Sequence, residues 1–513
     1  MEKTLRALSP GESGIIFRVG NRSATVKRRL VDMGLTPGTR ITVKKVAPFG
    51  DPIEVTVRGY ELSLRKEDAE QIELLPNGKS DADIKKVNKI IYAERRFDSE
   101  TLQRMRRDHE RELGHLLKTY DPLAHDSREM KIALVGNPNS GKTTLFNALT
   151  GSNQYVGNWP GVTVEKKEGK AKTDGKSVTI VDLPGIYSLS PYSLEEIVAR
   201  DFIVKDIPDA IINIVDATNI ERNLYLTIQL LELERPMVLA LNFMDEVRKN
   251  GDFIDVDSLS KQLGVPVVPV TAKTGENLDE LLHIAHMQIH EGYTIEPDDL
   301  YDDFTHEIHH EMDQIIRDAA YAAKIPAHWA SIKLLEGDKL VENALNLNED
   351  DRAALAAIID KYESSSALGD RETLIADSRY RYIEKVIGSA VKKGCAPDEL
   401  TPSDKIDRIL THRLLALPVF LLMMLTIFAV TFGPLGSLLQ DGVASFIDNY
   451  LASGLDYLLA SSGTAPWLRS LVVDGIIAGV GGVLTFLPQI ALLFFFLSLL
   501  EDSGYMARAA FVM

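Results

Sequence analysis

A glycine-rich segment of eight residues constrains this chain more than any other feature. Residues 136–143 read Gly-Asn-Pro-Asn-Ser-Gly-Lys-Thr and match the pattern G-x-x-x-x-G-K-[ST] at every fixed position. The segment follows an apolar run that is typical of a buried strand, and it precedes a helical pattern at 144–149. In that setting the backbone N–H groups of the loop and of the helix N-terminus can bind a phosphate chain. The sequence therefore predicts a nucleoside triphosphate site.

The surroundings of this segment predict an α/β domain. Short apolar runs alternate with helical patterns throughout residues 129–290, which indicates a mainly parallel sheet with helices on both faces. We therefore expect an α/β P-loop domain over this range. The runs expected to form strands are 132–135, 178–181, 210–215, 237–241 and 267–270.

Two motifs have side chains that suit phosphate and Mg²⁺. Lys142 can reach the β- and γ-phosphates, and Thr143 can offer its hydroxyl to Mg²⁺. Residues 182–185 (Asp-Leu-Pro-Gly) end a strand, where Asp182 can hold Mg²⁺ through water and Gly185 can sense the γ-phosphate. The predicted phosphate-binding residues are Gly136, Asn137, Pro138, Asn139, Ser140, Gly141, Lys142, Thr143 and Thr144.

Two further motifs select the base. Asp245, in the sequence Asn-Phe-Met-Asp at 242–245, can accept hydrogen bonds from guanine N1–H and N2–H₂, while Asn242 contacts the opposite edge. Adenine would leave that carboxylate unpaired, a loss of roughly 10⁴-fold or more. Thr271, Ala272 and Lys273 follow the last strand and can support the base. Together the four motifs predict a GTPase.

The sequence provides fewer of the side chains expected for hydrolysis than of those expected for binding. Thr163, in the segment 157–164, is the natural second hydroxyl for Mg²⁺, and it joins Lys142 and Asn139 as a predicted catalytic residue. Residues 182–185 are followed by Ile-Tyr, where Ras-like enzymes have a glutamine that orients water. The sequence therefore predicts slow intrinsic hydrolysis. Asn139 is a candidate ligand for a monovalent cation, although from the residues alone an asparagine here more often stabilises the loop.

The rest of the chain divides by composition. Residues 1–76 alternate apolar and polar positions between turn signals, which predicts a small β-barrel with one short helix at 26–33. Residues 77–128 are rich in charge and are expected to form a partly helical linker. Residues 291–400 have the spacing of a polar helical domain.

Residues 401–513 have the composition of a membrane segment. Residues 414–432 carry no charge and are long enough to span a bilayer, and 475–500 form a second uncharged run. Lys405, Arg408 and Arg413 precede the first run, which favours a cytoplasmic location for the N-terminal domains. The region 436–460 is amphipathic and is expected at the membrane interface. Two spans are few for a pore, so the sequence is expected to be truncated in its membrane domain.

Composition argues against several other classes of protein. The formal net charge of −17 disfavours nucleic-acid binding, which usually needs a basic face. The single cysteine, Cys395, cannot form an intramolecular disulfide, and the first residues lack a secretory signal. Residues 306–310 spell H-E-x-x-H, but their acidic neighbours favour a polar surface helix over a zinc protease site.

At this point the chain resembles the ferrous iron transport protein B family. The resemblance rests on residues 136–143, 156–165, 182–185, 242–245 and 499–508. Residues 1–76 are similar to ferrous iron transport protein A, a small SH3-like protein, through 29–38 and 47–52. The resemblance implies GTP as substrate, Mg²⁺ and K⁺ as cofactors, Asn139 as the K⁺ ligand that promotes hydrolysis, and Fe²⁺ as the transported ion. It further implies a multi-pass protein of the cytoplasmic membrane, in which residues 291–400 couple nucleotide state to the membrane part.

Two alternatives stay open at the level of the sequence. One is a membrane GTPase switch that recruits partners without transporting anything, and the other is a soluble-type GTPase of RNA or ribosome maturation. Neither the choice between driving and gating transport nor the existence of a homo-oligomer follows from the residues.

Overall fold

The computed structural model describes most of the chain in two compact units. One unit comprises residues 1–44 and 55–397, and the other comprises 45–54 and 398–513. The expected linker at 77–128, Thr163, Cys395 and the basic residues before the first apolar run lie outside the described residues. The described residues are 3–20, 23–47, 50–75, 130–151, 154–159, 162, 164–291, 297, 299–365, 370–394, 410 and 415–512.

The N-terminal residues form a six-stranded sheet in the order β1-β6-β2-β3-β4-β5. Alternation explains the strands: in β5 (Tyr60–Leu64) every second side chain is buried. The predicted helix at 26–33 is α1 (Ala24–Asp32), and the chain leaves it through Gly34 at φ 80°. The other elements are β1 (Lys3–Thr4), β2 (Ser13–Val19), β3 (Arg40–Val46), β4 (Ile53–Val57), β6 (Ile72–Leu74) and α2 (Lys66–Ala69).

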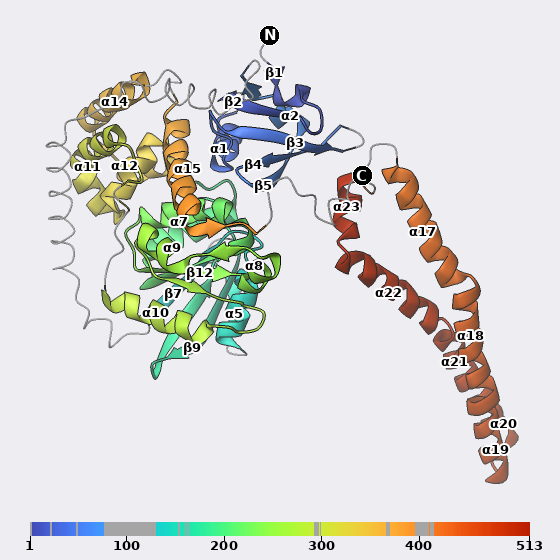
Figure 1. Ribbon diagram of the computed structural model, residues 1–513. Coiled ribbons are helices and arrows are strands. Elements are labelled where there is room, and N and C mark those ends of the chain that lie inside the picture. Colours follow the sequence, from blue (N-terminus) through green and yellow to red (C-terminus); the bar gives the residue numbers. More distant parts are fainter. Residues whose placement is uncertain are drawn as a thin grey trace. The chain divides into compact units, whose positions relative to one another are not determined.

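A seven-stranded sheet follows in the order β14-β12-β11-β7-β10-β9-β8 (Figure 1). The five predicted strands pair in parallel, whereas β8 and β9 form an antiparallel edge that the sequence did not predict. The strands are β7 (Met130–Gly136), β8 (Gln154–Asn158), β9 (Glu165–Thr173), β10 (Lys176–Asp182), β11 (Ala210–Asp216), β12 (Met237–Asn242) and β14 (Val267–Pro269).

Apolar side chains cover both faces of this sheet. Leu134 on β7 packs in a cluster with α5 (Lys142–Thr150) and α10 (Leu278–Glu291). Its neighbour Val135 belongs to a cluster on the other face, which also contains residues of α7 and α9. Burial on both faces explains why the central strands are continuous apolar runs. The remaining helices of the domain are α6 (Leu194–Asp201), α7 (Ile220–Leu231), α8 (Met244–Asn250) and α9 (Val256–Leu263).

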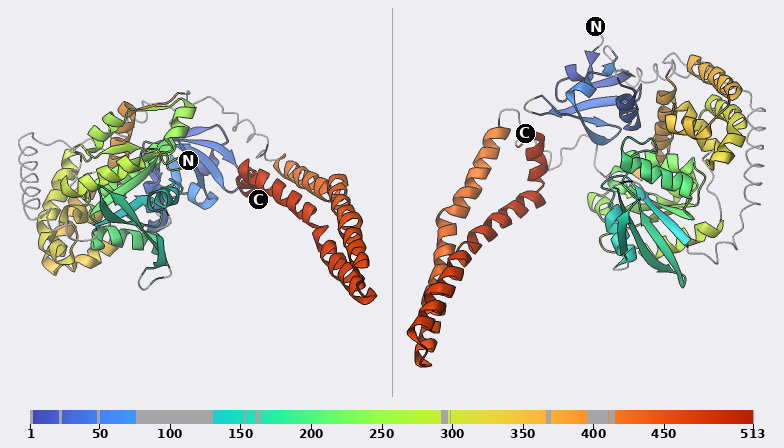
Figure 2. Two further views of the ribbon diagram at one scale, coloured as in Figure 1. Left: turned by 90° about the horizontal axis from the view of Figure 1, so that it is seen from below. Right: turned by 180° about the vertical axis from the view of Figure 1, so that it is seen from behind.

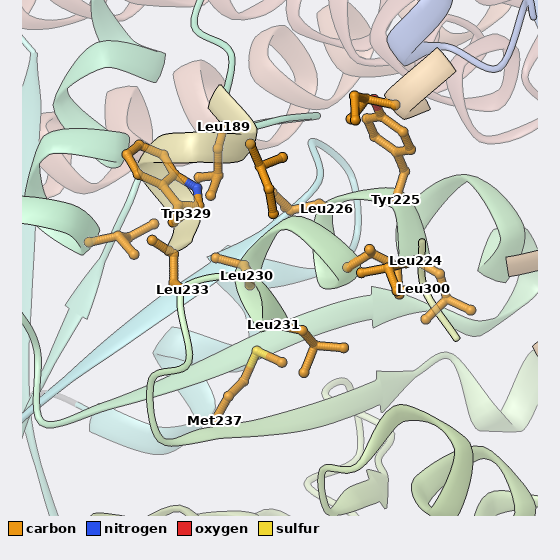
Figure 3. Packing of buried hydrophobic residues seen from close by; sticks show 14 of the residues in the cluster. Leu189, Leu224, Tyr225, Leu226, Leu230, Leu231, Leu233, Met237, Leu300 and Trp329 are labelled. Atoms are coloured by element: carbon orange, nitrogen blue, oxygen red, sulfur yellow. The ribbon is translucent and has the colours of Figure 1, made fainter. Parts of the chain in front are cut away.

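A helical domain adds its own apolar side chains to the cluster that contains Val135. Trp329 and Leu300 pack with Leu224 and Leu230 of α7, so both domains share one apolar core (Figure 3). After α15 the chain returns to the sheet domain, where β15 (Val391–Lys392) pairs with β13 (Phe253–Ile254). The helices are α11 (Asp303–Ala323), α12 (Ala327–Leu335), α13 (Lys339–Leu345), α14 (Glu349–Ser364) and α15 (Arg371–Ala390).

The described residues of the second unit include two helices long and apolar enough to cross a membrane, Ala416–Ser461 and Pro466–Asp502. They lie side by side as an antiparallel pair (Figure 2). The region 436–460 is helical and belongs to the long apolar run that begins at Ala416, within which Gly433 departs from helical geometry and Pro434 opens α18. Its expected place at the membrane interface stays a prediction. The segments are α17 (Ala416–Phe432), α18 (Pro434–Phe446), α19 (Ser453–Ser461), α20 (Pro466–Ser470), α21 (Ala478–Leu484), α22 (Leu487–Asp502) and α23 (Tyr505–Val512), with π-helical turns at Ile447–Ala452 and Leu471–Ile477.

Candidate nucleotide site

The predicted phosphate loop connects β7 to α5 through two left-handed residues. Asn139 has φ 67° and Gly141 has φ 85°. A Cβ atom on Gly141 would lie 2.2 Å from Asn242 Nδ2, and one on Gly136 would lie 2.7 Å from the Ile214 carbonyl oxygen. Both positions therefore require glycine, for space at each and also for backbone conformation at Gly141.

A cavity of about 580 Å³ opens at the N-terminus of α5. This position suits an anion, since the first N–H groups of a helix have no partner within it. All but one of the lining residues belong to the predicted set, and the exception is Glu195 in the first turn of α6. The lining residues are Asn137, Pro138, Asn139, Gly141, Lys142, Thr143, Thr144, Gly185 and Glu195.

The groups expected at Mg²⁺ and the phosphates come together from two parallel strands. Asp182 lies at the end of β10, opposite Leu134 of β7, and Lys142 Nζ forms an ion pair with its carboxylate. A Cβ atom on Gly185 would lie 3.1 Å from Pro138 Cα, so the backbone at Gly185 is packed against the phosphate loop. A carboxylate and the Thr143 hydroxyl are oxygen donors of the kind that Mg²⁺ prefers, so the residues present fit this ion.

Polar groups within the loop also fit a polar ligand. The side-chain amide of Asn137 and the hydroxyl of Ser140 are buried, and they have no hydrogen-bond partner among the described residues. Buried polar atoms normally have a hydrogen-bond partner. The unpaired side chains of Asn137 and Ser140 are therefore a reason to expect a hydrogen-bonding ligand here.

Asn242 has a role that the sequence did not reveal. Its Nδ2 donates to the Ser140 carbonyl oxygen over 2.9 Å, and its Oδ1 accepts from the Ala272 N–H over 3.0 Å. The side chain is 1% exposed. Asn242 thus ties the phosphate loop to the loop 271–273, in addition to any contact with the base edge where we expected it.

The other predicted base-binding residues lie around this tie. Asp245 is exposed in the first turn of α8. Thr271 is buried and donates from its hydroxyl to Glu276 over 2.9 Å, whereas Lys273 is exposed. Glu276 also pairs with Arg248 of α8 over 2.7 Å, and these hydrogen bonds lower the pKa of Glu276. The loop 271–276 is therefore fixed to the helix that carries Asp245.

The segment that leads toward Thr163 in the sequence has an apolar anchor. Trp159 is buried, its ring meets Phe202 edge-to-face with centroids 5.3 Å apart, and Lys166 Nζ lies 4.8 Å from the Trp159 ring. This anchor holds residues 157–159 on the sheet domain.

Beyond Gly185 the chain stays close to the phosphate loop. The Ile186 N–H donates to the Gly136 carbonyl oxygen over 3.2 Å, and Ile186 is buried. The Tyr187 ring lies under the Arg222 guanidinium, 4.5 Å from its centroid. Ile186 and Tyr187, which follow Gly185 in the sequence, are thus both held by contacts within the sheet domain.

The H-E-x-x-H residues differ from the expected surface helix. His309 is buried against His306 and His328, with ring centroids 4.7 Å away in each case, because this face of α11 packs into the domain core. Among the residues that the structure describes, no group of three His, Cys, Asp or Glu side chains could hold a metal ion.

Comparison with known proteins assigns families to three parts of the chain. The family model of ferrous iron transport protein B matches residues 130–285, that of the FeoA domain matches 3–76, and that of the FeoB cytosolic helical domain matches 301–392.

Curated relatives extend the similarity across the chain. A Fe(2+) transport protein A/Fe(2+) transporter FeoB fusion protein of Porphyromonas gingivalis is 36% identical over 99% of this chain and 60% of its own length. The Fe(2+) transporter FeoB of Staphylococcus aureus is 43% identical over 74% of this chain and 56% of its own length. The chain therefore spans less than two thirds of either relative.

Solved structures cover about half of the chain. The GDP-bound G-domain of S. thermophilus FeoB is 42% identical with a TM-score of 0.48, over 51% of this chain and 100% of that one. The cytosolic domain of T. maritima FeoB in a GDP form is 36% identical with a TM-score of 0.44, over 52% and 99%.

Proposed function

Because this chain belongs to the ferrous iron transport protein B family, with a FeoA domain at its N-terminus, we propose that it binds and hydrolyses GTP and that its nucleotide state regulates or drives Fe²⁺ uptake. The observation that carries this proposal is the tie made by Asn242. The Asn242 side chain joins the phosphate loop to the loop 271–273, which is proposed to support the base.

Each predicted residue then has a role in binding. The loop 136–144 holds the phosphates, Lys142 contacts the β- and γ-phosphates, and Gly185 senses the γ-phosphate. Asp245 accepts from the guanine edge, and residues 271–273 support the base. Thr143, Thr163 and Asp182 are the proposed Mg²⁺ residues, and Mg²⁺, when bound, neutralises charge on the phosphate oxygens.

Hydrolysis requires a water molecule in line with the γ-phosphate. Lys142 stabilises the negative charge that spreads over the transferred group, while Thr163 and Gly185 close around it. Ile186 follows Gly185 at the sequence position where Ras-like enzymes have a glutamine, so the intrinsic rate is expected to be slow. Asn139, which lines the cavity and has a left-handed backbone, is the proposed K⁺ ligand.

The remaining parts are proposed to serve a membrane protein. Residues 129–290 form the G domain, 291–400 the regulatory helical domain and 401–513 the first part of the membrane domain, with residues 1–400 on the cytoplasmic side. The two long apolar helices support this assignment. All family models and relatives named above are iron transport proteins, so they give no support to an RNA or ribosome-maturation GTPase.

The test of the nucleotide chemistry is GTP hydrolysis by residues 129–400 in K⁺ and in Na⁺ buffer. We expect faster turnover in K⁺, loss of that stimulation in Asn139→Ala, and no turnover in Lys142→Ala. Asn147→Ala, an exposed asparagine on α5 outside the cavity, is the matched control. Equal rates in both salts would contradict the K⁺ role but leave the GTPase proposal standing.

The transport part needs a protein with the full length of the relatives. Reconstituted in vesicles, it should accumulate Fe²⁺ in a manner that depends on GTP. Hydrolysis without any metal uptake would instead favour the membrane switch that transports nothing.

A further inference from the structure

The sheet domain has a basic surface near the beginning of β7, away from the phosphate loop that follows its end. Lys131 of β7 and Lys170 and Lys172 of β9 are exposed, and all three line one cavity of about 640 Å³. Strand register brings them together, because Lys131 and Lys170 pair with Thr179 of β10 from its two sides. Lys172 lies two residues along β9 from Lys170 and so shares its face. The three lysines therefore leave the same face of the sheet as neighbours.

This face is opposite to the one on which α5 and α10 pack. Ile132 and Ala171, which are next to the lysines in the sequence, belong to the cluster that contains residues of α5 and α10. Both of these helices contact β9. Successive side chains of a strand point to opposite faces, so the lysines point away from α5 and α10. On the face of the lysines, α7 and α9 contact β11 and β14, which lie on the other side of β7 from β9.

The charge of this surface is opposite to that of the chain. The chain has a formal net charge of −17, whereas among the residues that line the cavity three lysines accompany one carboxylate, Glu168. That carboxylate also pairs with Lys166 over 2.7 Å. Tyr155 of β8 lies opposite Glu168 and is 69% exposed. Exposed lysines beside an exposed tyrosine are typical of surfaces that meet the headgroup layer of a bilayer.

A bilayer is within reach of this surface. The first unit ends at residue 397 and the first apolar helix begins at Ala416. A chain of this length spans no more than about 70 Å even when it is fully extended. Headgroups around the apolar helices are therefore present at high effective concentration near the first unit. This tether matters, because three lysines attract anionic lipid by only about 5-fold each and would hold an untethered domain weakly.

We propose that Lys131, Lys170 and Lys172, with Tyr155 beside them, form a docking surface for the anionic lipid headgroups of the membrane that holds the apolar helices. The proposal rests on the proposed membrane location and adds to it a lipid-binding face of the sheet domain. Lys131 is the second residue of β7, and the phosphate loop follows the last one. Docking therefore leaves the phosphate cavity open to solution at the other end of the strand.

The test uses the complete chain reconstituted in vesicles of phosphatidylcholine, with or without phosphatidylglycerol. A headgroup spin-labelled lipid serves as quencher. The fluorophore is attached at Ser177→Cys, an exposed position that lines the cavity, in a Cys395→Ser background, since Cys395 is the single native cysteine. We expect stronger quenching in the anionic vesicles. A label at Ser364→Cys, an exposed serine at the end of α14 in the helical domain, is the matched control and should be quenched equally in both.

Charge variants decide whether the lysines are responsible. Lys170→Gln combined with Lys172→Gln should lower the ratio of docked to undocked chain by about 5-fold for each lysine. Lys324→Gln combined with Lys339→Gln removes the same charge from exposed positions of the helical domain and should leave the quenching unchanged. At 1 M salt, where the Debye length is about 3 Å, the quenching should disappear while the chain stays in the vesicles.

The outcomes that contradict the docking surface are distinct from failure of the membrane location. Equal quenching of the Ser177 label in neutral and anionic vesicles would overturn the proposal, and so would equal effects of the two lysine pairs. Absence of quenching in anionic vesicles would also overturn it and would direct attention to an acidic protein as the partner. If the chain does not enter vesicles at all, the proposed membrane location fails, and the docking surface fails with it.

Discussion

Asp245 and Asn242 belong to one motif, yet the structure places them differently. Asn242 is buried and bonded to two loops, whereas Asp245 is exposed and free to meet a base edge. Base selection should therefore depend on Asp245. The Asp245→Asn change replaces a carboxylate oxygen by an amide N–H₂ group, which is a donor. Guanine presents the donor N2–H₂ at this edge, so two donors would face each other. Xanthine has a carbonyl oxygen at C2 instead, which can accept from the amide.

We predict that Asp245→Asn weakens GDP binding by about 100-fold or more and improves xanthosine diphosphate binding to a similar extent. Fluorescent nucleotide titrations measure both constants. Asn242→Ala is the contrasting variant, since it should weaken both nucleotides together without exchanging their order. Retained guanine preference in Asp245→Asn would contradict the assigned base contact.

A second prediction at the residue scale concerns Glu221, in the first turn of α7. Burial raises its pKa to about 7, with Glu384 adding to the rise and Arg58 and Lys393 opposing it. The folded chain therefore holds the Glu221 proton more tightly than the unfolded chain. This contribution to stability is fully present below the unfolded pKa of about 4.5 and is lost as pH rises toward 7.

Glu221→Gln should accordingly match the unaltered chain near pH 4.5 and exceed its free energy of unfolding by about 2 kcal/mol at about pH 8. Thermal unfolding of both chains across this pH range measures the difference. Glu246→Gln, an exposed carboxylate on α8, is the control. A Glu221→Gln chain that loses stability at the higher pH would show that the carboxylate is needed in its charged form.

Residues with local signatures were predictable, and residues with distant partners were not. The loop glycines, Lys142 and Asp182 follow from motif spacing, because the chemistry of phosphate binding dictates residue type at fixed intervals. The Asn242 tie spans 102 residues and the contact of Asp32 with Tyr225 spans 193. No sequence pattern announces such pairs, since the fold alone brings them together.

At the scale of elements, the parallel strands could be predicted from local sequence patterns, whereas β9 could not. The parallel strands are buried on both faces and read as apolar runs, whereas β9 (Glu165–Thr173) is mostly polar and has no apolar period to detect. Its pairing with β10 over seven residues, not its composition, makes it a strand. His309 on α11 was mistaken for a surface residue for a similar reason, since its burial depends on neighbouring helices.

The junction between α7, α12 and α15 supports a prediction at this scale. Arg379 donates to both oxygens of Glu232, over 2.6 and 2.9 Å, and also pairs with Glu336; Arg379 and Glu232 are fully buried. Burial opposes ionisation of Glu336, but Arg379 and Lys333 outweigh it and lower the pKa of Glu336 to about 2. Removing the guanidinium would leave two enclosed carboxylates without their main partner.

We predict that Arg379→Met lowers the free energy of unfolding by about 3–5 kcal/mol. Adding Glu232→Gln should restore part of the loss, because it removes one of the uncompensated charges. Arg381→Met, two residues along α15, breaks a more exposed pair with Asp377 and should cost about 1 kcal/mol or less. Denaturant titrations compare the variants, and equal losses for Arg379→Met and Arg381→Met would contradict the role of the buried cluster.

At the scale of the whole molecule, the two units differ in what they bury. The first unit encloses its apolar side chains in shared cores. In the most apolar windows of Ala416–Ser461 and Pro466–Asp502, only 17% and 6% of the residues are buried. Large exposed apolar surfaces of this kind indicate contact with lipid or with further protein. Both runs were visible in the sequence, since an uncharged stretch of this length has few other uses.

We therefore predict that the complete chain sediments with membranes and resists alkaline carbonate extraction, whereas residues 1–397 remain in the supernatant. Leu422→Asp combined with Phe494→Asp should release the complete chain, since each places a charge on an exposed apolar face of one helix at a cost of about 2.5–3.5 kcal/mol. Leu422→Ala with Phe494→Ala alters the same positions without charge and should leave the chain in the membrane. Release of the unaltered chain by carbonate would show instead that these helices lie against protein, and the membrane assignment would then have to rest on residues outside this sequence.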